Sequence, residues 1–101
     1  MSRELAVWWD GCVTGSLGID PNSDMQFVYD RDWLSDAEAP ALSFPLPKQS
    51  EPFRRRECQP FFGGILPEEG QRTAIARALG VSAENEFRLL EDIGQDTALA
   101  I

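Results

Sequence analysis

The sequence contains no histidine in its 101 residues and only two cysteines, Cys12 and Cys58. Histidine is the most common general base and metal ligand at neutral pH, so its absence removes the simplest route to acid–base or metal chemistry. Two separated cysteines cannot form a zinc set of the Cys/His type, and they do not make a disulfide framework. We therefore expect free thiols and a reduced, cytoplasmic protein.

Motifs for phosphate and calcium binding are also missing. The glycine pairs at residues 15–18 and 63–64 fit neither a P-loop nor a dinucleotide-binding loop, and the catalytic motifs of protein kinases do not occur. The carboxylates lack the spacing of a calcium loop, and adjacent acidic pairs are read as solvated or helix-capping groups. The sequence therefore predicts a protein that is not an enzyme, with no catalytic residue, cofactor or metal.

Basic residues are few, because 9 Lys and Arg stand against 17 Asp and Glu, which gives a net charge of −8. Direct binding of nucleic acid needs clustered Lys and Arg, so we do not expect it. The short run Arg54-Arg55-Arg56 is either a polar loop or a docking contact to an acidic partner surface. No run of 18 apolar residues and no signal peptide occurs, so we expect no membrane partner.

The residues that are present suffice for one folded domain over residues 1–101, since 43% of them are hydrophobic. The first part of the chain has the patterns of strands and the last part those of helices. The sequence therefore predicts an α+β fold, with a small antiparallel N-terminal sheet and C-terminal helices packed on it.

Three strands in an antiparallel meander are expected, at residues 4–9, 12–20 and 25–29. The dipeptide Asp10-Gly11 is typical of a tight hairpin turn between the first two. Gly15 and Gly18 indicate a bulge or a close backbone approach in the second strand.

The middle of the chain should connect the sheet to the helices. Asp32-Trp33-Leu34 is expected to form a short turn or helical piece that places Trp33 on the sheet. Residues 41–47 should be extended, because each proline biases its predecessor away from the helix, and Pro45 would allow only an edge strand. Residues 48–58 are expected to form a polar loop.

Helices are expected at residues 59–62, as a single turn, and at residues 67–79 and 83–93. Pro67 should start the second and Gly80 should end it, and Ser82 is a candidate N-cap for the third. The core-facing residues of the second helix are expected to be Ala74, Ile75, Ala78 and Leu79. Residues 95–101 are either a closing strand or a short helix.

Two consecutive tryptophans lie on the first expected strand, so their side chains should point to opposite faces. Trp9 continues the apolar alternation of Leu5 and Val7, and we expect it in the core. Trp8 is either covered by a second layer or is an anchor in an interface with a partner.

Five elements of the sequence resemble, in order and spacing, the N-terminal subdomain of HipA-like serine/threonine kinases. They are residues 5–11 with 15–17, residues 27–34 (like F-x-Y-x-x-x-W-L), residues 40–47 (like P-L-S-x-S-L-P), residues 61–67 with Arg72 (like F-F-x-x-L-L-P…R) and residues 87–96 (like F-x-L-L-x-x-I-G-x-D). Phe44 and Pro45 depart from the third pattern. Leu99 stands where the family continues with glycine into the kinase body, and the kinase core is missing from this sequence.

A free-standing subdomain of this kind is similar to the HipS-type antitoxins of bacterial HipBST toxin–antitoxin systems. The resemblance implies an antitoxin that binds and inhibits a HipT-like kinase, while a HipB-like helix-turn-helix protein makes the DNA contact. The alternative is an N-terminal structural subdomain of a full HipA-like kinase, without inhibitory activity of its own.

Eight residues are candidate partner contacts: Trp8, Phe62, Gly63, Gly64, Ile65, Leu66, Glu68 and Glu69. The segment 62–70 is the candidate inhibitory contact, because it starts with glycines, carries apolar side chains and precedes a helix. Two alternatives remain open at this stage. Ile65 and Leu66 could instead cap the core, and Gly63-Gly64 could instead be a turn that needs special backbone angles.

Overall fold

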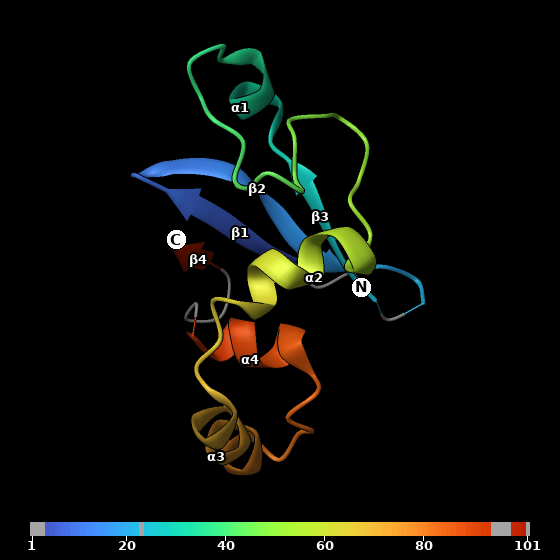
Figure 1. The fold of residues 1–101 in the computed structure, drawn as a ribbon, viewed down its shortest axis with the longest axis vertical. Helices are drawn as coiled ribbons and strands as arrows, with labels where there is room; N and C mark the ends of the chain where they lie inside the picture. Colours follow the sequence, from blue (N-terminus) through green and yellow to red (C-terminus); the bar gives the residue numbers. More distant parts are fainter. Residues whose placement is uncertain (1–3, 23, 94–97, 101) are drawn as a thin grey trace.

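The computed structural model describes residues 4–22, 24–93 and 98–100. Its elements, in chain order, are β1 (Glu4–Trp9), β2 (Cys12–Ile19), β3 (Met25–Tyr29), α1 (Arg31–Ser35), α2 (Arg55–Gly63), α3 (Glu69–Leu79), α4 (Glu86–Ile93) and β4 (Ala98–Ala100) (Figure 1). The predicted α+β fold, with an N-terminal antiparallel sheet followed by packed helices, is confirmed.

The sheet has the strand order β3-β2-β1-β4. The predicted meander is confirmed, since β2 pairs antiparallel with both β1 and β3. Asp10 and Gly11 form the hairpin turn with φ values of 53° and 78°, the left-handed conformation that such a turn requires. β4 pairs with β1 in parallel, so residues 98–100 form the closing strand of the two predicted options, while residues 95–97 and 101 lie outside the described residues.

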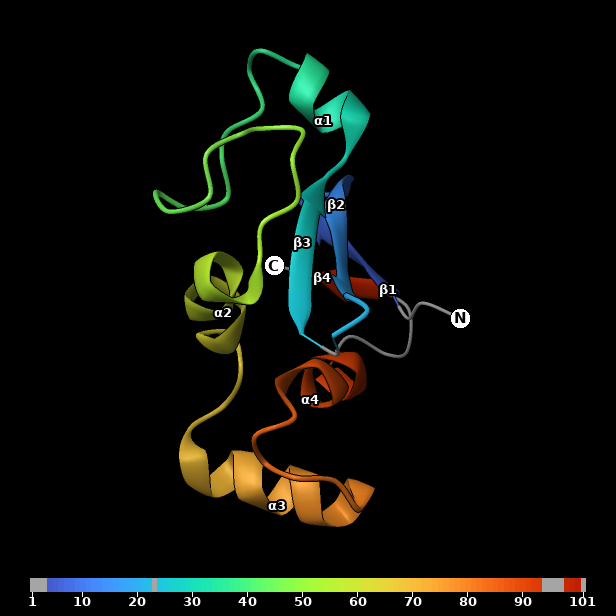
Figure 2. The same cartoon turned by 90° about the vertical axis from the view of Figure 1, so that its right-hand side faces the viewer.

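The core lies on one face of this sheet. Figure 2 shows α2 beside β3 on that face, α4 below the sheet and α3 beyond α4. Fully buried side chains from the strands meet fully buried side chains from the helical half: Leu5, Val7, Leu17, Phe27, Phe53, Phe62, Leu89 and Leu90. Among the described residues, no helix covers the opposite face of the sheet (Figure 2).

The β1–β2 pair contains a bulge beside the two tryptophans. The register shifts between Val7 and Trp8, and Thr14 and Gly15 are both buried where one residue would alternate. The predicted bulge or close approach near Gly15 is therefore confirmed. Trp9 is only half-buried, so its predicted place in the core is wrong. It packs instead on Trp33 of α1, with ring centroids 5.8 Å apart, and this confirms the predicted role of α1.

The connection from α1 to α2 differs from the prediction. Residues 41–47 are not a strand, because Leu46 N–H donates to Ser43 O at 3.0 Å and closes a tight turn. Helix α2 begins at Arg55 rather than at residue 59, so the predicted polar loop is too long. The backbone N–H of Arg54 donates to the Glu57 carboxylate at 3.3 Å, and this cap starts the helix in a segment that reads as polar.

The last two helices start later than predicted. Helix α3 starts at Glu69, with Glu68 as its N-cap, and not at Pro67. Helix α4 starts at Glu86, where Asn85 Oδ1 accepts from Arg88 N–H at 3.3 Å. Ser82 caps only a preceding turn, through Glu84 N–H at 3.2 Å. Gly80, with φ 72°, ends α3 as predicted.

The core-facing side of α3 is narrower than predicted. Ala74 and Ala78 are exposed, Ile75 and Leu79 are half-buried, and Ala76 is buried. The reason is that α3 packs on α4 and lies away from the sheet, so only a thin stripe is covered. No described helix combines the length and the apolar composition needed to cross a bilayer.

Candidate partner-binding surface

Trp8 lies on the uncovered face of the sheet. Leu5 and Val7 of the same strand point into the core with 0% exposure, and the alternation of the strand turns Trp8 outward with 38% of its surface exposed. A large indole that remains exposed on a rigid strand is a typical anchor residue of a protein interface. Trp8 is expected either to be covered by a second layer or to be an anchor in an interface. No described element provides that covering layer.

The side chains around Trp8 are small and without charge. Val13 is its partner on β2, and the next row across the sheet joins Ala6, Ser16 and Val28. We call this set the open face: Ala6, Trp8, Val13, Ser16 and Val28. The four neighbours are half-exposed. The open face is therefore a flat, largely apolar surface that another protein could cover without desolvating a charge.

The predicted inhibitory segment has a different character, because most of its apolar side chains belong to the core. Phe62 is fully buried, with its ring centroid 5.3 Å from that of Phe27, and Leu66 is 7% exposed. Ile65 is half-buried against the same cluster. The reading that these side chains cap the core is confirmed for Leu66.

Of the eight candidate residues, those of this segment that are exposed are Gly64, Glu68 and Glu69. They follow α2, which covers the face of the sheet opposite to Trp8 (Figure 2). The structure therefore divides the eight candidates into an anchor on the open face, a buried group at the end of α2, and three exposed positions beyond it. It does not bring all eight into one surface.

Gly63 lies against a polar network and does not have special backbone angles. Neither Gly63 nor Gly64 has a positive φ, so the predicted special turn is wrong. A Cβ atom on Gly63 would lie 2.7 Å from Glu86 Oε2 and 2.7 Å from Gln59 Nε2. A larger residue at this position would push the ends of these two side chains aside and disturb their contact.

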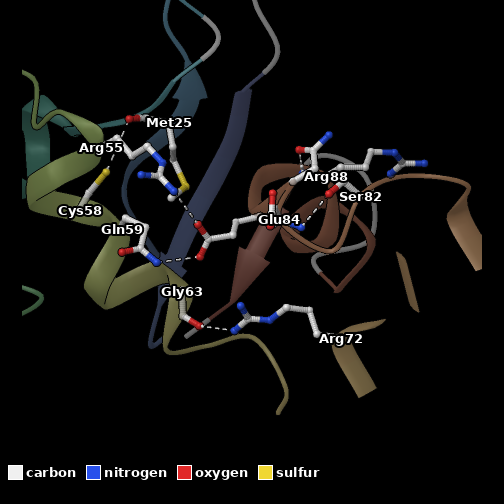
Figure 3. A network of polar contacts seen from close by, with 11 residues as sticks. Met25, Arg55, Cys58, Gln59, Gly63, Arg72, Ser82, Glu84 and Arg88 are labelled. Carbon is white, nitrogen blue, oxygen red and sulfur yellow. Dashed lines mark hydrogen bonds and ion pairs between the residues drawn. The ribbon is translucent and has the colours of Figure 1, made fainter. Parts of the chain in front are cut away.

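The network joins α2, α3 and α4 (Figure 3). The Glu86 side chain accepts from Gln59 Nε2 at 2.8 Å and from Arg55 Nη2 at 3.3 Å. Arg72 Nη2 donates to Gly63 O at 3.4 Å, which connects α3 to the end of α2. Glu86 is 9% exposed, so we read these contacts as structural connections that hold the helices in register.

Phe44 is an exposed surface residue that is not among the eight predicted partner contacts. Its side chain is 100% exposed at the tip of the turn between Ser43 and Leu46. The Tyr29 hydroxyl donates to Leu46 O and accepts from Leu42 N–H at 3.0 Å, which clamps both sides of the turn. The available signal was that Phe44 and Pro45 are the local variants within the family-like segment at residues 40–47.

The described part of the chain offers no group of three His, Cys, Asp or Glu side chains that could hold a metal ion. Cys12 is exposed, Cys58 is buried, and both are free thiols. Burial raises the pKa of the Cys58 thiol to about 11. A buried thiol that stays protonated is a poor nucleophile.

Comparison with known proteins places the chain in a family. The family model described as the HipA N-terminal domain matches residues 5–101. A protein named "Putative kinase Y4mE", from Sinorhizobium fredii (strain NBRC 101917 / NGR234), is 52% identical over 99 residues. The match covers 98% of this chain and 24% of that protein, so the chain spans about a quarter of its relative's length. Because the family model matches nearly every residue, this chain belongs to the HipA N-terminal domain family.

Proposed function

We propose that this chain docks on the kinase body of a HipA-type kinase and, supplied as a separate polypeptide, inhibits it as the antitoxin of a toxin–antitoxin complex. The observation that supports docking is the open face, where Trp8 is 38% exposed and no helix of the described residues covers the sheet. When both faces of a sheet are apolar, one is normally buried by the helices of the domain, and the other is buried by a further layer or by a partner protein.

The partner is inferred from the relative. In Y4mE, a protein named as a kinase, the matching module is 24% of the length, so most of that protein lies outside the module. An apolar face that the module leaves uncovered is a natural contact for that remainder. When the kinase body is a separate, HipT-like polypeptide, the same face would form the interface between the two proteins.

Inhibition would need a second contact besides the anchor. Of the exposed positions, Gly64 caps the C-terminal end of α2, and Glu68 and Glu69 lie at the start of α3. Docking through the open face would leave them free to contact a neighbouring lobe and hold it in an inactive geometry. In this proposal a HipB-like protein contributes the DNA contact, and the complex acts in the cytoplasm, where the two thiols remain reduced.

The second candidate is a structural subdomain that completes a kinase without inhibiting it. The observation that favours it is the 52% identity to Y4mE over nearly the whole chain, because in that relative the module is part of a longer protein. Both candidates require docking, and they differ only in the effect of docking on phosphoryl transfer.

A titration separates the two. The purified chain is added to a HipA-type kinase body that lacks its own N-terminal subdomain, while binding is followed by calorimetry and phosphoryl transfer by phosphate incorporation. An antitoxin reduces the phosphorylation rate in step with saturation of a single site. A structural subdomain binds equally well but restores or leaves unchanged the phosphorylation rate, and absence of binding at high excess contradicts both.

Two variants locate the interface. Trp8→Ala removes the anchor at a position whose side chain does not support the core, so it should weaken binding while the unfolding temperature stays near that of the wild type. Gln71→Ala, at an exposed position of α3, is the matched control and should bind as the wild type does. Equal affinity of the Trp8→Ala variant and the wild type would exclude the open face as the contact.

A further inference from the structure

A hollow lies at the end of the sheet where the β1–β2 hairpin meets α1. Its lining residues are Trp9, Asp10, Trp33 and Pro40, and its volume is about 440 Å³. Trp8 points away from it, because consecutive residues of a strand lie on opposite faces. The hollow is therefore a separate feature from the open face, and none of the eight candidate partner contacts lines it.

The aromatic walls of the hollow are held in place by their own contacts. The two indole rings lie 5.8 Å apart between centroids with an angle of 30° between their planes. Trp33 Nε1 donates to Pro40 O at 2.9 Å, so the polar edge of this ring is already satisfied and fixes the proline wall. A ligand would meet preformed ring surfaces, which keeps the ordering cost of binding low.

The charge around the hollow is negative. Asp10 is exposed at the hairpin turn, and residues 30–40, which carry Trp33 and Pro40, contain four carboxylates against the single Arg31. The ammonium of Lys48 also lies near this segment, but it donates to Asp36 O at 2.7 Å and to Ala39 O at 2.8 Å. Two indoles beside an exposed carboxylate form the combination that attracts an organic cation.

We propose that this hollow binds an arginine side chain of a partner protein. A planar guanidinium can stack on an indole and at the same time donate hydrogen bonds to the Asp10 carboxylate, which a compact ammonium group does less well. The overall charge of −8 favours partners with basic surfaces, so an arginine is also the side chain that such a partner would present. The inference does not depend on which kind of protein docks on the open face.

The test uses the full chain and the nuclear magnetic resonance signals of its three indole N–H groups. The probe is a capped Gly-Arg-Gly peptide, and its matched control carries citrulline, which has nearly the same shape as arginine but no charge. The arginine peptide should shift the Trp9 and Trp33 signals in a saturable manner and leave the Trp8 signal in place. Equal affinity for the citrulline peptide, or equal shifts at Trp8, would overturn the proposal.

A single substitution tests the carboxylate. Asp10→Asn removes the charge but keeps the turn, because asparagine accepts the left-handed backbone that Asp10 adopts at φ 53°. We expect the affinity for the arginine peptide to fall roughly threefold, which is the usual contribution of a partly exposed ion pair to binding. Asp24→Asn, at an exposed acid in the turn between β2 and β3, is the control and should not change it. An unchanged affinity in the Asp10→Asn variant contradicts the assignment.

Discussion

At the scale of single residues, Gly15 shows how closely the strands approach the core. A Cβ atom built on it would lie 2.3 Å from Val28 O and 2.6 Å from Phe27 Cζ, and both groups are fixed by the sheet. We expect Gly15→Ala to lower the free energy of unfolding by about 1–3 kcal/mol, the usual cost of overpacking a core, in a urea titration. Gly70→Ala in α3 is the control, because no atom lies within 4 Å of its added Cβ. It should raise stability by about 0.5–1 kcal/mol.

The buried Cys58 thiol leads to a prediction of how the stability of the fold depends on pH. Burial raises the pKa of its thiol from an ordinary value of 9.0 to about 11 in the folded chain. The unfolded thiol therefore ionises first, so the stability that this group contributes is complete below pH 9 and declines between pH 9 and about 11. Burial also raises the pKa of Tyr29, which acts in the same direction above pH 10.

Two measurements check this behaviour. Unfolding in urea at a series of pH values should show the decline, and Cys58→Ala should make it smaller. A thiol reagent at pH 8 should modify one cysteine in the folded protein, the exposed Cys12, and both after unfolding. Rapid modification of both cysteines in the folded chain would contradict the burial of Cys58.

At the scale of elements, the strands could be predicted from the sequence and the helix starts could not. The alternation of apolar side chains in β1 and the Asp10-Gly11 turn are signals between residues close in the sequence. The meander could therefore be predicted from them. The start of α2 depends on a cap between Arg54 and Glu57 and on burial of Cys58, inside a run that is polar on average. Trp9 lies on the core face as alternation predicts, but it is the last residue of β1 and packs on Trp33 of α1, a long-range contact that alternation does not show.

The three-helix network yields the prediction at this scale. Glu86→Ala removes the acceptor for Gln59 Nε2 and Arg55 Nη2 and leaves the partly buried amide without its partner. We expect the free energy of unfolding to fall by about 1–3 kcal/mol, the cost of an unsatisfied polar group. Glu84→Ala, at an exposed position two residues earlier, should change it by less than about 0.5 kcal/mol. Thermal unfolding of the two variants side by side provides the comparison.

At the scale of the whole molecule, the candidate site could be predicted only in part. Two consecutive tryptophans on one strand indicated that one of them would be on a second face, and Trp8 lies there with 38% exposure. The burial of Phe62 and Leu66 could not be read from the sequence, because an apolar run after a helix fits both a core cap and a contact loop. The exposure of Phe44 could not be predicted either, because the turn that carries it is held by Tyr29, which is distant in the sequence.

The charge and the open face should affect docking in separable ways. A net charge of −8 speeds the encounter with a basic partner, and this effect is screened by salt. The anchor at Trp8 contributes only after contact, so it should govern dissociation. We expect the association rate constant with the kinase body to fall about tenfold or more from low to high salt. Trp8→Ala should raise the dissociation rate constant roughly tenfold and keep the same salt dependence of association.

Surface plasmon resonance at several salt concentrations measures both rate constants, with Gln71→Ala as the control on α3. If the Trp8→Ala variant lost affinity through slower association alone, the indole would act in the encounter and would not be a buried anchor. If salt left the association rate unchanged, the partner's contact surface would not be basic, and the acidic excess would serve only to keep this small domain hydrated. Faster dissociation at every salt concentration, together with salt-sensitive association, is the pattern that a flat apolar face surrounded by acidic surface should produce.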